Sequence, residues 1–176
     1  MPAVSMAATE LPDPILATWL ENTGSLTARL KALGGRFEVT LLAEGRTPAA
    51  EAGPGWRQGD ALWHREVLLK LDGVAWVYAL TEVPMATLAA GHIDFRRLGE
   101  QPLGEVLFTH PQMRRGPLVV HHYGGQSRPA DVARQLGQPA TLGLWGRGRQ
   151  FFLAERPLRV NEVFLPAAQQ ALGAAK

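Results

Sequence analysis

Two runs of alternating apolar residues, 61–71 and 74–83, are separated only by Asp72-Gly73. An Asp-Gly pair between alternating runs is the strongest short-range signal for a β-hairpin, and a two-residue turn fixes which residues lie opposite each other. The chain must therefore build an antiparallel sheet around this hairpin. The cross-strand pairs expected from the turn are Leu71 with Val74, Leu69 with Trp76, Val67 with Tyr78, and Arg65 with Leu80.

The remaining elements are short helices and further strands. Asp13 before Pro14 predicts a helix start, and Ser25 predicts a second helix that ends at Gly34. Helical turns are expected at 84–90, 93–98, 102–108 and 132–136, and strands at 36–44, 117–122, 150–154 and 158–165. Residues 47–60 read as a loop. Consecutive hairpins without strand–helix–strand repeats predict an α+β fold with one antiparallel sheet.

Length and composition indicate a single globular domain over residues 1–176, with 1–12 flexible and an Ala- and Gln-rich tail at 167–176. Apolar residues make up 46% and charged residues 19%, as in folded soluble proteins. The net charge is only +2 and the basic residues are dispersed, so we expect no nucleic-acid partner. The short pairs Arg114-Arg115 and Arg147/Arg149 are interpreted as solvated surface, with a binding patch as the alternative.

The chain has no cysteine, which excludes disulfides and thiolate chemistry. It shows neither a signal-peptide pattern at its start nor an 18-residue apolar run, so we expect a cytoplasmic protein with no membrane partner. His121 and His122 are adjacent and therefore point to opposite faces of a strand, which does not suit two ligands of one metal. We expect no metal site.

Two charged residues lie on faces that are otherwise apolar. Arg65 shares its strand face with Trp63, Val67 and Leu69, and Glu162 shares its face with Leu158, Val160 and Phe164. An unpaired buried charge costs several kcal/mol, roughly the net stability of a small domain. Each therefore needs a partner inside the protein.

Two interpretations follow, and alternation alone does not choose between them. Arg65 and Glu162 form a structural salt bridge with each other, or they line a cavity in which Arg65 receives an anionic ligand and Glu162 meets a hydroxyl or a reacting atom. Small-molecule sites are commonly apolar pockets with a few fixed polar groups.

Four segments in the same order resemble the chorismate pyruvate-lyase family. They are residues 63–69 (WHREVLL), 102–108 (PLGEVLF), 143–147 (GLWGR) and 161–166 (NEVFLP), and weaker agreement extends the likeness from about Trp19 to Pro166. The resemblance implies six antiparallel strands with surrounding helices, and a ligand sealed beneath helical flaps. The ligand-contacting positions that it implies are Leu26, Arg65, Leu103 and Glu162, with Arg65 and Glu162 as the catalytic residues.

The implied reaction converts chorismate into 4-hydroxybenzoate and pyruvate for ubiquinone synthesis, with no cofactor. Because aromatisation of the ring drives it, the protein needs to supply only orientation, exclusion of water and charge stabilisation. The chain departs from the family pattern in having Leu80 where an arginine is familiar, Leu26 where Met is familiar, and a longer segment at 123–139. We expect Leu80 to alter how the second carboxylate of chorismate is held, and we expect a monomer.

Two rival functions remain open from the sequence. The same fold serves as an effector-sensing domain in bacterial transcription regulators, so the chain is alternatively a non-catalytic binder of small aromatic acids. A structural protein in which Arg65 and Glu162 form only a core ion pair is the other alternative. Turnover of chorismate and the stability of an Arg65 variant distinguish these readings.

Overall fold

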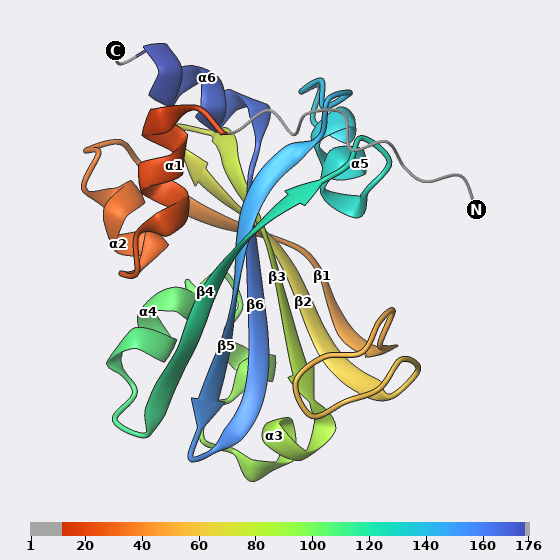
Figure 1. Cartoon of the computed structure of the whole chain (residues 1–176). Helices are drawn as coiled ribbons and strands as arrows, with labels where there is room; N and C mark the ends of the chain where they lie inside the picture. The colour runs from red at the N-terminus through yellow and green to blue at the C-terminus, as the bar shows by residue number, and fades with distance from the viewer. Residues whose placement is uncertain (1–11, 175–176) are drawn as a thin grey trace.

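The computed structural model describes residues 12–174, which form a six-stranded antiparallel sheet with helices on both faces (Figure 1). The strand order is β1-β2-β3-β6-β5-β4. The strands are β1 (Phe37–Pro48), β2 (Ala61–Leu71), β3 (Val74–Pro84), β4 (Met113–Tyr123), β5 (Leu144–Leu153) and β6 (Arg156–Phe164). The helices are α1 (Pro14–Glu21), α2 (Leu26–Lys31), α3 (Met85–Ala90), the 3₁₀ turn η1 (Phe95–Arg97), α4 (Leu103–Thr109), α5 (Arg128–Gln135) and α6 (Pro166–Ala174). The predicted α+β class is confirmed; residues 1–11, expected to be flexible, lie outside the described part.

Local chemistry explains the first elements. Asp13 Oδ1 accepts a hydrogen bond from the Ile15 amide at 2.9 Å and starts α1, and Ser25 Oγ accepts one from the Ala28 amide at 3.2 Å and starts α2. Asp72 and Gly73 both have positive φ, 50° and 79°, as a two-residue turn joining twisted strands requires. The predicted β2–β3 hairpin is therefore present.

The register expected from that turn holds only near the turn. Leu71 pairs with Val74, but a bulge leaves Trp76 without an opposite residue, so that Leu69 pairs with Val77 and not with Trp76. Beyond the bulge Tyr78 lies opposite Leu68, and Leu80 lies opposite Glu66. The predicted pairs Leu69–Trp76, Val67–Tyr78 and Arg65–Leu80 are wrong, because one extra residue moves every later side chain to the other face.

A second bulge lies in β1, which is longer than predicted. Leu41 pairs with Val67 and Ala43 with Glu66, so Leu42 is the extra residue. After this bulge Glu44 pairs with Arg65. The irregularity therefore brings an acidic side chain onto the face that carries the buried arginine.

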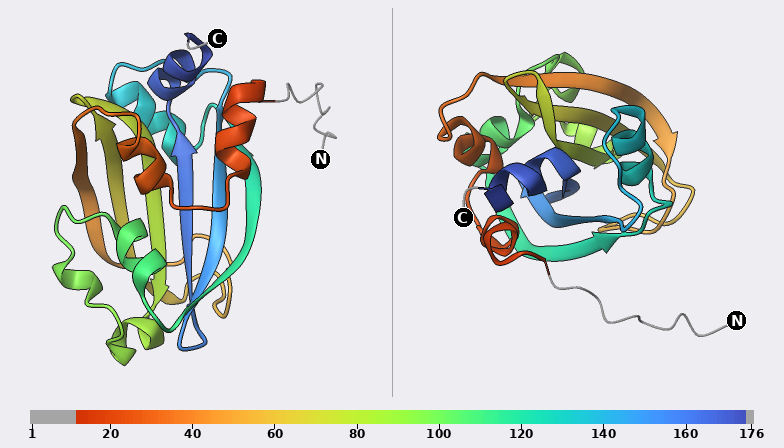
Figure 2. Two further views of the ribbon diagram at one scale, coloured as in Figure 1. Left: turned by 90° about the vertical axis from the view of Figure 1, so that its left-hand side faces the viewer. Right: turned by 90° about the horizontal axis from the view of Figure 1, so that it is seen from above.

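The two faces of the curved sheet are covered by different helices (Figures 1 and 2). Helices α1, α2 and α4 lie on one side, called here the first face, and α5 lies on the other. On the first face, Leu20, Leu30 and Phe164 belong to a core cluster under α1, α2 and α6, and Leu103, Leu107 and Phe151 belong to a separate cluster around α4. Charged residues lie between these two clusters.

Two of the segments that differ from expectation are α6 and β5. The expected tail is helix α6, whose Ala168 and Leu172 are buried in the first-face core. Strand β5 begins six residues before the predicted strand at 150–154, and thus contains Arg147 and Arg149. Within residues 12–174, no helix has the length and apolar character needed to cross a membrane.

Candidate active site

A cavity opens on the first face of the sheet, where the two core clusters meet. Its roof comes from α2 and α4, and its floor from strands β2, β3, β6 and β5. Two rows of paired residues cross these four strands and form the floor: Arg65, Thr81, Val160 and Arg149 in one row, and Val67, Ala79, Glu162 and Arg147 in the next. The predicted hollow between apolar strands is therefore present; the first row has an arginine at each end, and the second row has Glu162 and Arg147 side by side at one end.

Arg65 lies almost wholly inside the protein, with 2% of its surface exposed. Its Nη2 donates to the carbonyl oxygen of Gln101 at 3.1 Å, while its Nη1 is buried without a hydrogen-bond partner. The nearest carboxylate oxygen is Glu44 Oε2 at 3.8 Å from Nη1, which is an ion-pair distance and too long for a hydrogen bond. Burial lowers the pKa of the Arg65 guanidinium, and the Glu44 charge partly opposes that shift. Arg65 thus keeps one donor available in the cavity.

Glu162 projects from β6 into the same cavity, where 21% of its side chain remains exposed. Its Oε1 accepts a hydrogen bond from Arg147 Nε at 3.1 Å. Its other oxygen, Oε2, accepts none from the residues that the structure describes. The alternative in which Arg65 and Glu162 pair directly with each other is wrong, because Arg65 pairs with Glu44 and Glu162 with Arg147.

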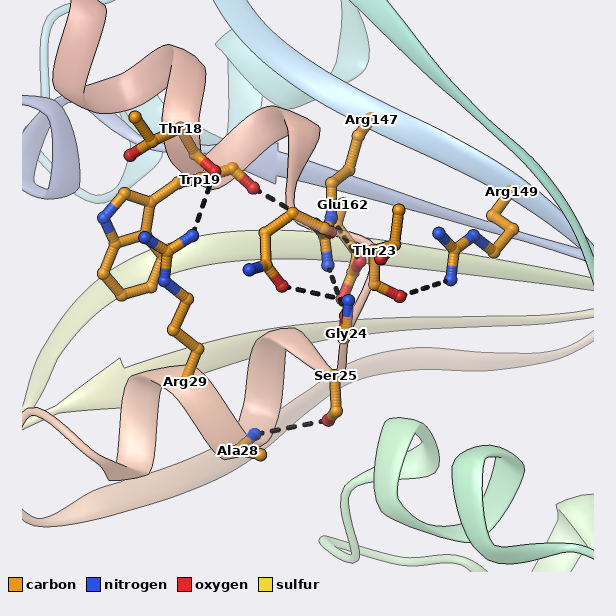
Figure 3. Close-up of polar contacts among 11 residues, drawn as sticks. Thr18, Trp19, Thr23, Gly24, Ser25, Ala28, Arg29, Arg147, Arg149 and Glu162 are labelled. Carbon is orange, nitrogen blue, oxygen red and sulfur yellow. Dashed lines mark hydrogen bonds and ion pairs between the residues drawn. The ribbon is translucent and has the colours of Figure 1, made fainter.

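Arg147 is an anchor for the connection between α1 and α2 (Figure 3). Besides its bond to Glu162, its Nη1 donates to the carbonyl oxygens of Trp19 and Asn22, and its Nη2 donates to that of Gly24 at 3.4 Å. All three guanidinium nitrogens therefore have partners within the protein. Arg147 fixes the orientation of the Glu162 carboxylate and holds the covering loop in place.

Arg149 lies beside Arg147 on β5 and reaches the same connection between α1 and α2. Its Nη1 donates a hydrogen bond to the carbonyl oxygen of Thr23 at 3.0 Å (Figure 3). The interpretation of Arg147 and Arg149 as solvated surface is wrong, since they are only 4% and 8% exposed. The sequence held a signal for this: Trp145, Arg147, Arg149 and Phe151 alternate with the residues between them, as Arg65 does with its neighbours. That signal was missed because the strand was predicted to begin at residue 150.

The two other predicted contact residues, Leu26 and Leu103, both line the cavity. Leu26 is the first residue of α2 and Leu103 the first residue of α4. The first backbone N–H groups of a helix have no partner within it. Pro102, which precedes Leu103, makes no side-chain hydrogen bond to that helix end. All four predicted site residues therefore border one cavity.

Leu80 and the histidine pair lie elsewhere. Leu80, His121 and His122 border a separate hollow on the opposite face of the sheet. The expectation that Leu80 affects a carboxylate in the first-face cavity is therefore wrong, because the bulge at Trp76 turns Leu80 away from it. Among the described residues, no group of three His, Asp or Glu side chains is placed to hold a metal ion.

Comparison with known sequences identifies a family. The family model described as chorismate lyase matches residues 4–171. A probable chorismate pyruvate-lyase of Shewanella sp. (strain ANA-3) is 41% identical over 165 residues, covering 94% of this chain and 87% of the relative. A protein of the same name from Pseudomonas syringae pv. syringae (strain B728a) is 38% identical over 175 residues, covering 93% of this chain and 86% of the relative.

Solved structures with a similar fold come from bacterial regulators. The effector domain of PhnF from Mycobacterium smegmatis superposes with a TM-score of 0.61 at 17% identity, covering 83% of this chain and 91% of that domain. The C-terminal domain of the histidine utilization repressor from Pseudomonas syringae pv. tomato gives a TM-score of 0.57 at 14% identity, with coverages of 76% and 94%. At these identities the likeness concerns the fold alone.

Proposed function

Because the chain belongs to the chorismate lyase family, we propose that it removes pyruvate from chorismate and leaves 4-hydroxybenzoate, the aromatic ring precursor of ubiquinone. The observation that carries this proposal is that one cavity contains both Arg65, which is buried and has an unused donor, and Glu162, whose carboxylate is held in place by Arg147. Chorismate offers matching groups, namely a ring carboxylate, a ring hydroxyl and an enolpyruvyl ether with its own carboxylate.

Each predicted residue has a specific role in this proposal. Arg65 holds the ring carboxylate through its free Nη1, assisted by the backbone N–H groups of Leu26 and Leu103. Glu162 accepts a hydrogen bond from the ring hydroxyl through Oε2, while Arg147 keeps the carboxylate oriented. Together these contacts fix the ring at both ends.

The reaction then follows from the substrate's own structure. The C–O bond to the side chain breaks, and the side chain leaves with the bonding electrons as the enolate of pyruvate. The carbon that bears the hydroxyl loses a proton, so that the ring becomes aromatic, and the enolate takes up a proton to give pyruvate. The protein residues orient the ring, exclude water and stabilise the charge that develops as the C–O bond breaks. Burial strengthens these electrostatic contacts, because the cavity has a lower effective dielectric constant than water.

The direct test is pyruvate release from chorismate by the purified protein and by two variants. Glu162→Gln keeps the size of the side chain but removes its charge, and Arg65→Ala removes the carboxylate contact. Either change should lower kcat/KM by roughly 100-fold or more. Glu155→Gln, on the exposed turn after β5, is the matched control and should retain full activity. Full activity of Glu162→Gln or Arg65→Ala would contradict the residue assignment.

The fold similarity to effector domains favours one second candidate, a non-catalytic sensor of small aromatic acids. Incubation of the wild-type protein with chorismate separates the two functions. An enzyme produces the ultraviolet spectrum of 4-hydroxybenzoate together with an equal amount of pyruvate. Saturable binding of chorismate without either product would establish the sensor instead.

A further inference from the structure

The charges around the cavity do not balance. Three arginines of the described chain are buried, and all three line this cavity: Arg65, Arg147 and Arg149. Glu44 lies at ion-pair distance from Arg65, and Glu162 at ion-pair distance from Arg147. Arg149 is the one buried arginine among residues 12–174 that forms no ion pair with a carboxylate. A buried cation without an ion-pair partner is strongly destabilising, so its retention calls for an explanation.

The hydrogen bonds of Arg149 leave it partly unsatisfied. Nη1 donates to the carbonyl oxygen of Thr23, but Nε is buried and has no partner. Arg147 differs, because every nitrogen of its guanidinium has a partner in the protein. Burial, reinforced by the positive charges of Arg147 and Arg115, lowers the pKa of Arg149, and the charge of Glu162 only partly opposes this shift. The environment therefore favours an anion at this position.

The sheet places Arg149 directly across the cavity floor from Arg65. The two arginines end one row of paired residues, with Thr81 and Val160 between them. Three inter-strand spacings separate their Cα atoms, which corresponds to about 14 Å. Glu162 lies in the adjacent row on the strand next to Arg149. The cavity thus has a free cationic donor at each end, and its carboxylate lies toward the Arg149 end.

We propose that Arg149 binds the ether-borne carboxylate of a dicarboxylate substrate while Arg65 binds the ring carboxylate. The assignment rests on the proposed function and extends it to the recognition of the leaving group. In chorismate the ether and the hydroxyl are on adjacent ring carbons, and the ring carboxylate is opposite the hydroxyl. With Glu162 on the hydroxyl, the ether-borne carboxylate faces Arg149 and the ring carboxylate faces Arg65. Arg149 is then the specificity residue that distinguishes substrate from the monocarboxylate product.

A pair of inert ligands isolates this contact. 3-(Carboxymethoxy)-4-hydroxybenzoate carries both carboxylates, and 4-hydroxybenzoate lacks the ether-borne one. Calorimetric titration of the full-length Arg149→Met protein should show roughly 10- to 100-fold weaker binding of the dicarboxylate, the loss expected for one charge-assisted contact. Binding of 4-hydroxybenzoate should change by less than about threefold, since its contacts are retained. The value of kcat/KM for chorismate should fall by the same factor as the dicarboxylate affinity.

Two further variants make the result decisive. Arg114→Met removes one positive charge from the exposed part of β4, outside the cavity, and should leave both affinities unchanged. Arg149→Gln retains a donor for the Thr23 carbonyl oxygen, so it tests the same contact if Arg149→Met folds poorly. It should likewise bind the dicarboxylate more weakly and leave the binding of 4-hydroxybenzoate unchanged. Equal weakening of both ligands would mean that Arg149 acts only by anchoring the loop, and unchanged dicarboxylate binding would also overturn the proposal. A wild-type protein that discriminates between the ligands but releases no pyruvate would refute the lyase activity and leave the role of Arg149 in place.

Discussion

Replacing Arg65 by Met should abolish function at little cost in stability. Met fills nearly the same space as the aliphatic part of arginine but carries no charge. The change removes the free Nη1 donor and the bond from Nη2 to the Gln101 carbonyl. A residue retained for its ligand, and not for the fold, is expected to show this combination of effects.

The magnitude follows from the contacts of Arg65. The hydrogen bond to Gln101 contributes about 1.5–3 kcal/mol, and the pair with Glu44 at 3.8 Å contributes about 4 kcal/mol at an effective dielectric constant of 20. Against this, the guanidinium no longer has to be desolvated, which returns several kcal/mol. The free energy of unfolding should therefore change by no more than about 2 kcal/mol, equivalent to about 4–8 °C in Tm for a chain of this length.

Thermal and urea unfolding of Arg65→Met, compared with its pyruvate release, checks this reasoning. Arg147→Met is the matched control from the same cavity. It should lose about 3–5 kcal/mol, because it leaves the Glu162 carboxylate without its partner and releases the α1–α2 connection. A loss of more than about 3 kcal/mol for Arg65→Met would mean that Arg65 is structural, and the cavity argument would then fail.

Three other substitutions test the face of the sheet opposite the cavity, the packing of β5, and helix α6. Burial alone would raise the pKa of Glu66, but hydrogen bonds from Tyr78 and Arg128 together hold it below its usual range. The stabilisation by Glu66 is therefore present near neutral pH and lost as the pH falls through this lowered pKa. Glu66→Gln should lower the free energy of unfolding by about 1–3 kcal/mol at pH 7. In urea titrations this difference from the wild type should be smaller at pH 3. In Gly146→Ala the new Cβ would lie 2.7 Å from the Glu162 carbonyl oxygen, which should cost about 1–3 kcal/mol in thermal melts. In Gly173→Ala in α6, the new Cβ meets no atom within 4 Å among residues 12–174, apart from its chain neighbours and its own helix backbone. The change should be neutral or stabilising by up to about 1 kcal/mol.

Local signals in the sequence predicted the elements of this fold well. The Asp72-Gly73 turn and the capping residues Asp13 and Ser25 act through their immediate neighbours, so the short sequence around each one is sufficient. The inward position of Glu162 was also predictable, because no bulge interrupts the alternation of β6. The position of Glu162 depends only on strand geometry, which repeats every two residues.

The partners of the inward charges were not predictable in the same way. Glu44 faces Arg65 only because Leu42 is an extra residue in β1, and nothing in the local pattern marks that position. Arg147 on β5 pairs with Glu162 on the neighbouring strand β6. Its other partners are backbone carbonyl oxygens, and because every residue has one, the sequence does not show which of them Arg147 will meet. Long-range pairing therefore determines which charge meets which, while alternation determines only that they face inward.

The bulge at Trp76 shifts the side-chain alternation of β3 by one residue. Before it, even-numbered residues point toward the first face, and after it odd-numbered residues do, so Ala79 and Thr81 reach the cavity whereas Leu80 does not. Regular pairing of Trp76 with Leu69, without the bulge, would turn the second half of the strand over by half a turn. Tyr78 and Leu80 would then point into the first-face cavity in place of Ala79 and Thr81, and the sheet would fill the cavity with its own side chains.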